Sequence, residues 1–281
     1  MRFRDRTYER GGPALVMGIL NVTPDSFFDG GRYGAVDAAR ARAADMLAQG
    51  AKIVDIGGRS YGRHVAPVDA AEERARVVPV VEALVRDRLP VALSIDTTHA
   101  EVADAALFSG AHLINDCSGL ADEGMAATVA RYDAGLVIMH LKGRLNVRDA
   151  EYRYDDACGE IAAFLRERSE QALAAGVGRE SIVLDPGIEF GKELTTDLEI
   201  LRRFGEFAAL GFPLLLATSR KTFLGELVGR PADELLAASL AAASLGIAAG
   251  AAIVRAHDVA PTVDVARVVA AVMKGRVPAC T

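Results

Sequence analysis

The sequence predicts an α/β fold of the (β/α)8, or TIM-barrel, class, and two patterns along the chain indicate it. Short aliphatic runs end in clusters of Asp, Asn, Ser, Arg or His, and helical patterns follow them. Eight such runs occur, at residues 15–21, 53–58, 91–96, 113–116, 136–140, 182–186, 214–221 and 252–258. Because a (β/α)8 barrel carries its reactive side chains at the carboxyl ends of its strands, we expect these clusters to share one rim.

The runs are short and continuously aliphatic, as expected of parallel strands that are buried on both faces. Apolar residues recur at helical spacing between them, in residues 37–49, 70–86, 98–109, 155–175, 196–210, 235–249 and 260–273. Gly50, Gly110 and Gly176 are expected to end three of these helices, and Thr98 can cap the start of one. A doubly wound open sheet uses the same alternation, but the eight units and the lack of a Gly-rich dinucleotide turn favour the barrel.

The composition is typical of one globular domain over residues 1–281, since α/β barrels run to about 250 residues as a unit. The net charge of −6 offers no basic surface for nucleic acid, and no apolar run reaches the ~18 residues of a membrane span. Residues 1–10 are not followed by the apolar core of a secretory signal. Cys117, Cys158 and Cys280 are widely spaced and odd in number, which fits neither a disulfide framework nor a zinc site. A cytoplasmic protein is the simplest interpretation.

Carboxylate and amide side chains follow three of the predicted strands. Asp96 ends the third strand, Asn115 and Asp116 end the fourth, and Asp185 ends the sixth. A single Asp after a strand is more often a helix cap, but several such groups on one rim, without basic partners beside them, favour a ligand site. We therefore expect them to converge on a heterocycle that is rich in N–H donors.

Cationic side chains follow the last two predicted strands, in Ser219-Arg-Lys221 and Arg255-Ala-His257. The loops after strands seven and eight form the usual phosphate site of this fold. Arg255 offers a bidentate fork, Lys221 a point charge and His257 a further donor. Each residue alone could be a salt-bridged surface residue, but together on adjacent strands they favour a site for phosphate or pyrophosphate.

The loop after the first strand reads Asn21-Val-Thr-Pro-Asp-Ser-Phe-Phe-Asp-Gly-Gly31. Its Thr-Pro-Asp start and its Asp-Gly-Gly end favour turns, so this segment could close over a ligand. A polar surface loop is the commoner role for such residues and remains an alternative.

Taken together, these segments resemble the dihydropteroate synthase family of pterin-binding barrels. The matching segments cover almost the whole chain in the order of the family: Met17-Gly-Ile-Leu-Asn-Val-Thr-Pro-Asp-Ser-Phe27, Val54-Asp-Ile-Gly-Gly58, Ser94-Ile-Asp-Thr97, Ile114-Asn-Asp-Cys-Ser-Gly119, Met139-His140, Asp185-Pro-Gly-Ile-Glu-Phe-Gly-Lys192, Ser219-Arg-Lys221 and Val254-Arg-Ala-His-Asp-Val259. The first segment and the last three are highly specific in combination.

The resemblance implies the joining of 6-hydroxymethyl-7,8-dihydropterin pyrophosphate to p-aminobenzoate, with release of pyrophosphate. By position, the implied pterin-binding residues are Asp96, Asn115, Met139, Asp185, Phe190 and Lys221. The implied pyrophosphate-binding residues are Asn21, Arg63, Arg255 and His257, with Asn21 also a ligand of Mg²⁺. The implied acceptor side consists of Phe27, Ser60, Tyr61, Arg63 and Thr222. The implied catalytic residues are Asp29, Lys221 and Arg255. Asp29 would stabilise the positively charged pterin methylene once pyrophosphate departs, and we expect the chain to form a homodimer.

The chain departs from the family most clearly after the second strand. The family usually reads Gly-Gly-Glu-Ser-Thr-Arg-Pro-Gly there, whereas this chain reads Gly57-Gly-Arg-Ser-Tyr-Gly-Arg-His64. Tyr61 and Gly62 thus replace the Thr and Arg that help hold p-aminobenzoate and pyrophosphate, and Arg59 replaces an acid. Two smaller departures are Glu189 and Ala217, each at a position where Gly is usual, and residues 141–148 are also unlike the family.

Three functions therefore remain open. The chain could carry out ordinary folate synthesis with an altered loop. It could instead couple the same pterin donor to another amine or nucleophile, or it could bind pterins without transferring them. A methyltetrahydrofolate-binding methyltransferase is a more distant alternative, because the Asn-Val-Thr-Pro-Asp-Ser-Phe loop is not expected there.

Overall fold

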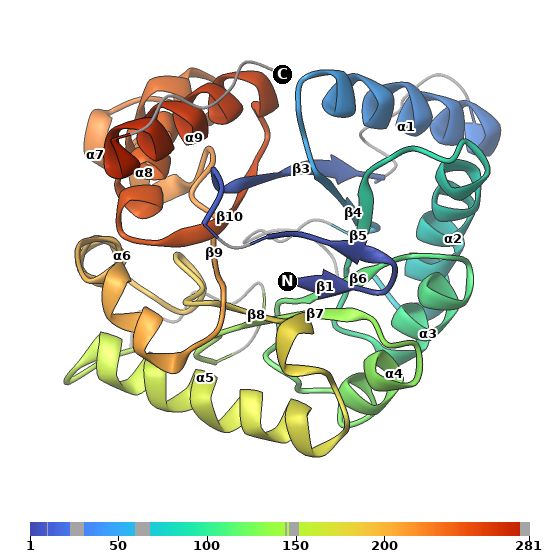
Figure 1. Ribbon diagram of the computed structural model, residues 1–281, viewed down its shortest axis with the longest axis horizontal. Coiled ribbons are helices and arrows are strands. Elements are labelled where there is room, and N and C mark those ends of the chain that lie inside the picture. The colour runs from blue at the N-terminus through green and yellow to red at the C-terminus, as the bar shows by residue number, and fades with distance from the viewer. Residues whose placement is uncertain (10, 23–30, 60–67, 144, 146–151, 276–281) are drawn as a thin grey trace.

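We obtained a computed structural model that describes residues 1–9, 11–22, 31–59, 68–143, 145 and 152–275. Within these residues, eight parallel strands close into a barrel surrounded by helices (Figure 1). Around the barrel the strands follow the order β10 (Ala251–Ala256), β3 (Leu15–Asn21), β4 (Ile53–Gly57), β5 (Ala92–Asp96), β6 (Leu113–Asp116), β7 (Gly135–Met139), β8 (Ile182–Asp185) and β9 (Leu214–Leu216). The predicted (β/α)8 fold is thus confirmed.

The outer layer consists of α-helices and short 3-10 turns. The helices are α1 (Gly31–Ala48), α2 (Ala70–Arg86), α3 (Ala100–Phe108), α4 (Met125–Arg131), α5 (Ala157–Ala174), α6 (Leu194–Arg202), α7 (Thr222–Val228), α8 (Leu236–Ala248) and α9 (Val259–Lys274). The 3-10 turns are η2 (Arg179–Ser181), η3 (Phe204–Leu210) and η4 (Ala232–Glu234). In the part of the chain covered here, none of the helices combines the length and the apolar character that a membrane crossing requires.

The predicted helices match these elements closely, with informative exceptions. The segment 70–86 coincides with α2, and Gly50 and Gly110 follow their helices with φ of +101° and +108°, as expected of helix-ending glycines. The segment 196–210 divides into α6 and η3, and the short helices α4 and α7 were not predicted. The proposed Thr98 cap is wrong, because the Ala100 N–H at the start of α3 donates instead to Asp122, at 2.8 Å.

The lower part of the barrel interior is filled by one layer of apolar side chains. Each of the eight strands contributes one, and these residues are Met17, Ile53, Ala92, Leu113, Val137, Val183, Leu215 and Ile253. The hairpin of β1 (Arg2–Phe3) and β2 (Arg6–Thr7) covers the amino-terminal end, where Phe3 packs into the layer (Figure 1). A Cβ atom on Gly135 would overlap the Phe3 ring, so glycine makes room for this plug. The hairpin was not predicted from the sequence.

The next layer toward the carboxyl ends of the strands is largely polar. Since side chains alternate along a strand, the residues two positions beyond the apolar layer also point into the barrel. These residues are Ile19, Asp55, Ser94, Asn115, Met139, Asp185, Ala217 and Arg255. The closed apolar layer below and the polar layer above together form the floor of a site at the carboxyl end.

His112 is a buried histidine at the opposite, amino-terminal end of the barrel. Its Nδ1 accepts a hydrogen bond from the Leu93 N–H at 3.0 Å, and burial lowers its pKa to about 4. Asp5 raises this pKa, whereas Arg6 and Arg4 lower it further.

We predict that His112→Asn reduces the loss of stability in acid. Because the folded-state pKa lies below the ordinary value of 6.5, the unfolded state binds the extra proton as the pH falls from 6.5 to about 4. Stability from this residue is therefore lost across that window, with a slope of at most about 1.4 kcal/mol per pH unit. Asn retains an acceptor for the Leu93 N–H but does not titrate. Urea unfolding at pH 7, 6, 5 and 4 measures the difference, and identical slopes for both proteins would contradict the prediction.

Candidate active site

A cavity of about 300 Å³ opens at the carboxyl end of the barrel. Ten residues expected from the sequence line it: Asn21, Asp96, Asn115, Met139, Asp185, Phe190, Lys221, Thr222, Arg255 and His257. Phe27, Asp29, Ser60, Tyr61, Gly62, Arg63 and His64 lie outside the described residues. The strand ends therefore bring the two predicted chemical halves, polar and cationic, into one cavity.

A buried ion-pair network forms the floor of this cavity. Arg255 Nε donates to Asp55 Oδ2 at 2.6 Å, and its Nη2 donates to Asp96 Oδ2 at 2.8 Å. Asn115 Nδ2 donates to the same Asp55 oxygen at 3.0 Å, and the Cys117 thiol donates to Asp96 at 3.1 Å. Burial acts against the charge of Arg255, but the attraction of Asp55 and Asp96 raises its pKa above the ordinary value. The network joins β10, β4, β5 and β6.

Two expectations from the sequence change in light of this network. Asp96 was expected to have no basic partner, and that is wrong, since it is paired with Arg255. Asp55 was not recognised as a site residue, although it is fully buried and its Oδ1 has no hydrogen-bond partner among the described residues. A single charge inside the aliphatic run of β4 was the available signal, because an isolated carboxylate is rarely fully buried without a partner.

Asp185 presents a carboxylate to the cavity from the end of β8. Its Oδ1 accepts the Gly187 N–H at 2.7 Å, so its other oxygen is available for a ligand as far as the described residues are concerned. Burial raises the pKa of Asp185, while Lys221 and the Gly187 N–H act in the opposite direction. Met139 is buried at the end of the adjacent strand β7. Asp185 thus offers a hydrogen-bond acceptor to a ligand, and Met139 offers an apolar contact beside it.

A buried lysine that the sequence analysis did not single out holds the loop after Asp185. Lys192 is 1% exposed, and its Nζ donates to the carbonyls of Gly187 and Phe190 at 2.7 and 2.9 Å. It also lies 2.9 Å from His140 Nδ1. Burial lowers the pKa of Lys192 to about 7. Because these carbonyls belong to the loop itself, the lysine fixes the backbone between Asp185 and Phe190.

Lys221 reaches the same loop from the start of α7. Its Nζ donates to the Ile188 carbonyl at 2.5 Å and lies 4.7 Å from the centre of the Phe190 ring. This position brings a positive charge next to an aromatic face and close enough to Asp185 to lower the pKa of that carboxyl. The lysine thus connects the polar and the cationic halves of the cavity.

His257 lines the cationic side together with Ser219. The Ser219 hydroxyl accepts the backbone N–H of His257 at 3.1 Å and lies 3.0 Å from the ring Nδ1. Burial, followed by the charge of Arg255, lowers the pKa of His257 to about 4, so the ring is neutral at pH 7. A neutral ring whose Nδ1 accepts from Ser219 has its proton on Nε2, where it can donate to an anionic ligand.

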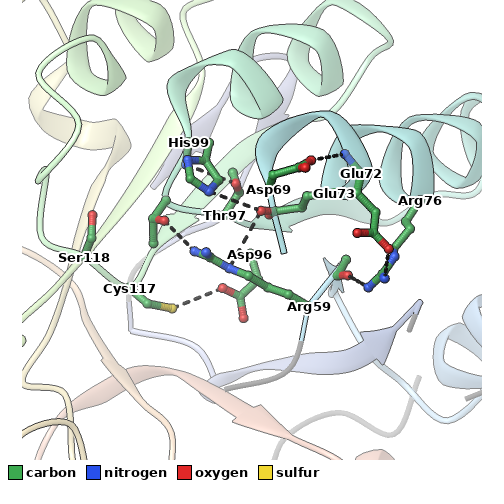
Figure 2. Close-up of polar contacts among 12 residues, drawn as sticks. Arg59, Asp69, Glu72, Glu73, Arg76, Asp96, Thr97, His99, Cys117 and Ser118 are labelled. Atoms are coloured by element: carbon green, nitrogen blue, oxygen red, sulfur yellow. Dashed lines mark hydrogen bonds and ion pairs between the residues drawn. The ribbon is translucent and has the colours of Figure 1, made fainter. Parts of the chain in front are cut away.

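Arg59 also lines the cavity, at the position where the resemblance leads one to expect an acid. Figure 2 shows it between Glu73 of α2 and Asp96 of β5. Its Nη2 donates to the Thr98 hydroxyl at 2.5 Å, and its Nε lies 3.8 Å from a carboxylate oxygen of the fully buried Glu73. Thr98 therefore anchors Arg59 rather than capping a helix. Arg59 adds a positive charge beside Asp96.

Asp116 takes the structural role that a strand-end carboxylate commonly has. Its Oδ1 accepts the backbone N–H and the hydroxyl of Ser118, at 2.8 and 2.6 Å, and its Oδ2 accepts the Leu120 N–H at 2.9 Å. Both oxygens are thereby used by the loop after β6. Asp116 shapes this loop and does not line the cavity described above.

The donor set for a metal ion is small. Within the described ranges, no group of three or more His, Cys, Asp or Glu side chains could hold a metal. Asn21 offers one amide oxygen at the end of β3, next to the cationic side of the cavity. Mg²⁺ commonly keeps several waters and takes further oxygens from substrate phosphates, so a single protein oxygen is compatible with a Mg²⁺ ion that arrives with pyrophosphate.

The chain is similar to known pterin enzymes over nearly all its length. The family described as pterin binding enzyme matches residues 17–257. Dihydropteroate synthase of Bacillus subtilis is 41% identical over 260 residues, covering 92% of this chain and 88% of that protein. Dihydropteroate synthase of Escherichia coli K12 is 39% identical over 261 residues, covering 93% and 92%.

Solved structures of dihydropteroate synthases show the same similarity. Dihydropteroate synthase of Clostridium difficile, crystallised in the presence of pteroic acid, is 41% identical with a TM-score of 0.89, covering 95% of this chain and 99% of that one. The enzyme of Xanthomonas albilineans with 4-aminobenzoic acid is 41% identical with a TM-score of 0.86, covering 93% of each chain.

We predict that Asp55→Ala lowers the free energy of unfolding by about 3–5 kcal/mol, because it leaves the partly buried Arg255 with only one of its two carboxylate partners. Asp45→Ala is the control, since it removes the partner of Arg42 at an exposed surface, where a pair contributes about 1 kcal/mol or less. Urea unfolding compares the two variants with the wild type. Equal losses in both would mean that the Asp55–Arg255 pair contributes no more than a surface contact.

Proposed function

The chain belongs to the dihydropteroate synthase family of pterin-binding enzymes, and on that premise we propose that it joins 6-hydroxymethyl-7,8-dihydropterin pyrophosphate to p-aminobenzoate. The products are 7,8-dihydropteroate and pyrophosphate. One observation carries the proposal: a single cavity contains acceptors for the N–H edge of a pterin, Asp185 and Asn115, beside donors for phosphates, Arg255, His257 and Lys221. The whole chain, residues 1–281, would act as one domain.

In the proposed complex, the pterin ring lies against the polar layer of the barrel. A pterin presents an amino group and a ring N–H side by side, and one carboxylate can accept from both. The free oxygen of Asp185 and the Asn115 amide would receive this edge. Met139 and Phe190 would contact the faces of the ring. Asp96 would also belong to the pterin side and would stay paired with Arg255.

The pyrophosphate would occupy the cationic side. Arg255 directs Nε and Nη2 to carboxylates, and its Nη1, which has no partner within the described part of the chain, would donate to a phosphate oxygen. His257 and Lys221 would add further donors, and Asn21 would provide one oxygen to a Mg²⁺ ion that accompanies the pyrophosphate. When bound, the ion neutralises the charge that develops on the departing group. Arg63, outside the described residues, is proposed for the same side.

In the proposed reaction, the amine lone pair forms a C–N bond with the pterin methylene carbon. The C–O bond to pyrophosphate breaks, its electron pair leaves with the pyrophosphate oxygen, and the new ammonium nitrogen releases a proton to solvent. Positive charge on the methylene carbon is the feature to be stabilised, and Asp29 is proposed for that role. Phe27, Ser60, Tyr61, Arg63 and Thr222 are proposed to shape the acceptor side.

A second candidate is transfer of the same pterin to a different amine. Glu189, at a position where the family usually has Gly, lines the cavity and contacts the backbone of Thr222 on the acceptor side, which favours this alternative. Both candidates share the pterin and pyrophosphate steps and differ only in the nucleophile.

We predict that the wild type releases pyrophosphate in the presence of the pterin donor and p-aminobenzoate, and that Asp185→Asn abolishes most of this activity. Asn can keep the bond to the Gly187 N–H, but its NH₂ then faces the donors of the pterin. Pterin affinity should fall by about 2–4 kcal/mol, as for a mispaired buried polar group.

Pyrophosphate release and calorimetric titration with a pterin provide the two measurements, and a chelator of Mg²⁺ should lower the first. Asp116→Asn is the control, because that carboxylate serves the loop after β6 and should not affect pterin affinity. Absence of pyrophosphate release with p-aminobenzoate would contradict the main proposal. Unchanged pterin affinity in Asp185→Asn would remove this residue from the site.

We further propose that the chain forms a homodimer through the neighbouring helices α6 to α9. Large apolar side chains are exposed on them, and these are Leu198, Leu227, Val228, Leu236, Leu245, Val268, Val272 and Met273. Exposed apolar surface that extends over several adjacent elements commonly marks an interface.

We also propose a cytoplasmic location for the protein. The buried free thiols of Cys117 and Cys158 support it, and cell fractionation can test it.

We predict that the wild type sediments as a dimer and that Leu245→Asp with Val272→Asp sediments as a monomer, because two buried charges would oppose the contact. Phe108→Asp is the matched control: Phe108 is 81% exposed on α3, outside the proposed interface, and its change should leave the mass unaltered. Sedimentation velocity distinguishes the species. A monomeric wild type, or a double variant that stays dimeric, would disprove pairing through these helices.

A further inference from the structure

Glu189 lies in the wall of the cavity and is held at both its backbone and its side chain. Its N–H donates to Asp197 Oδ1 at 2.6 Å, and its Oε1 accepts the backbone N–H of Thr222 at 2.7 Å. The second contact connects the loop after β8 to the first residue of α7. The carboxylate therefore has a defined position on the rim.

The backbone of Glu189 makes this position unusual. Its φ is +76°, in the left-handed region that favours glycine and is disfavoured for other residues. Glycine could adopt the same backbone without that cost. The backbone conformation therefore disfavours any side chain at this position. The Glu189 side chain nevertheless provides the contact with Thr222 and places a carboxylate in the cavity wall.

The contact with Thr222 places Glu189 on the side of the cavity that is proposed for the third reactant. Under the proposed function, Asp185 and Asn115 receive the pterin, and Arg255 and His257 receive the pyrophosphate. Thr222, the described residue proposed for the acceptor side, lines the same cavity, and Glu189 accepts its backbone N–H. Glu189 thereby brings a carboxylate to the acceptor side of the cavity.

We propose that Glu189 is a specificity-determining residue that disfavours acceptors with a carboxylate and favours aryl amines with a neutral substituent. This inference rests on the proposed function, because it takes the acceptor to lie on this wall. The physical reason is repulsion between two carboxylates that face the same cavity. p-Aminobenzoate is then a weaker acceptor than its uncharged amide.

The test compares two probes that differ by one charge, p-aminobenzoate and p-aminobenzamide. Dissociation constants are measured by titration in the presence of a pterin and pyrophosphate, and turnover is measured by pyrophosphate release with the pterin donor. Glu189→Gln keeps the size and an oxygen that can accept the Thr222 N–H, and it removes only the charge. Glu193→Gln removes the same charge from an exposed position a few residues along and serves as the control.

We predict that Glu189→Gln tightens binding of p-aminobenzoate about tenfold, which corresponds to about 1.4 kcal/mol, and changes binding of p-aminobenzamide less than twofold. Glu189→Gly should shift the ratio in the same direction and also relieve the backbone strain. Glu193→Gln should leave both constants unchanged.

A ratio of the two dissociation constants that stays within twofold in Glu189→Gln would overturn the inference. So would an equal shift in Glu193→Gln, because a general change of charge would then explain the effect. Turnover separates this result from the proposed function: no pyrophosphate release with either amine contradicts the transferase, whereas the binding ratio still decides the role of Glu189.

Discussion

The arrangement of the cavity depends on one partly buried cation, Arg255, and its two buried carboxylate partners. A charge in this position is tolerated only because Asp55 and Asp96 compensate it, since an unpaired ion inside a protein costs several kcal/mol. The pairing connects β10 to β4 and β5 and orients the Asn115 amide through Asp55. Because these side chains occupy the layer directly above a closed apolar layer, the barrel presents a rigid polar floor to any ligand.

The loop after β8 is organised by a second set of buried charges. Lys192 and Asp197 lie beneath it, where burial lowers the pKa of the lysine to about 7 and raises that of the aspartate to about 6. Lys192 binds the loop carbonyls and Asp197 accepts the Glu189 N–H, so the backbone conformation is set from below. This support also explains how Glu189 can hold a left-handed backbone conformation at the rim. Arg59 and Glu189 add a cation and a carboxylate to the walls of the same cavity.

Much of the fold and part of the site could be predicted from local patterns. For most strands, the aliphatic runs predicted the first and last residue to within one or two positions. Helix α2 was predicted at its observed bounds. Asp96, Asn115 and Asp185, expected at the strand ends, line one cavity because parallel strands in a barrel present their carboxyl ends on the same side, whereas Asp116 serves the loop after β6. The amino-terminal hairpin, α4 and α7 were missed, since very short elements carry too little periodicity to be recognised.

The sequence alone determined the alternation of strand and helix, the class of barrel and the identity of most side chains on its rim. These features follow from periodicity and spacing, which are properties of neighbouring residues. Only the tertiary structure decided which polar side chains meet: Arg255 and Asp55 are 200 residues apart, Arg59 and Thr98 are 39 apart, and Lys192 and His140 are 52 apart. No local pattern encodes such contacts, because they arise when closure of the barrel brings distant strand ends together. The partner of a buried charge is therefore set by the packing of the whole chain.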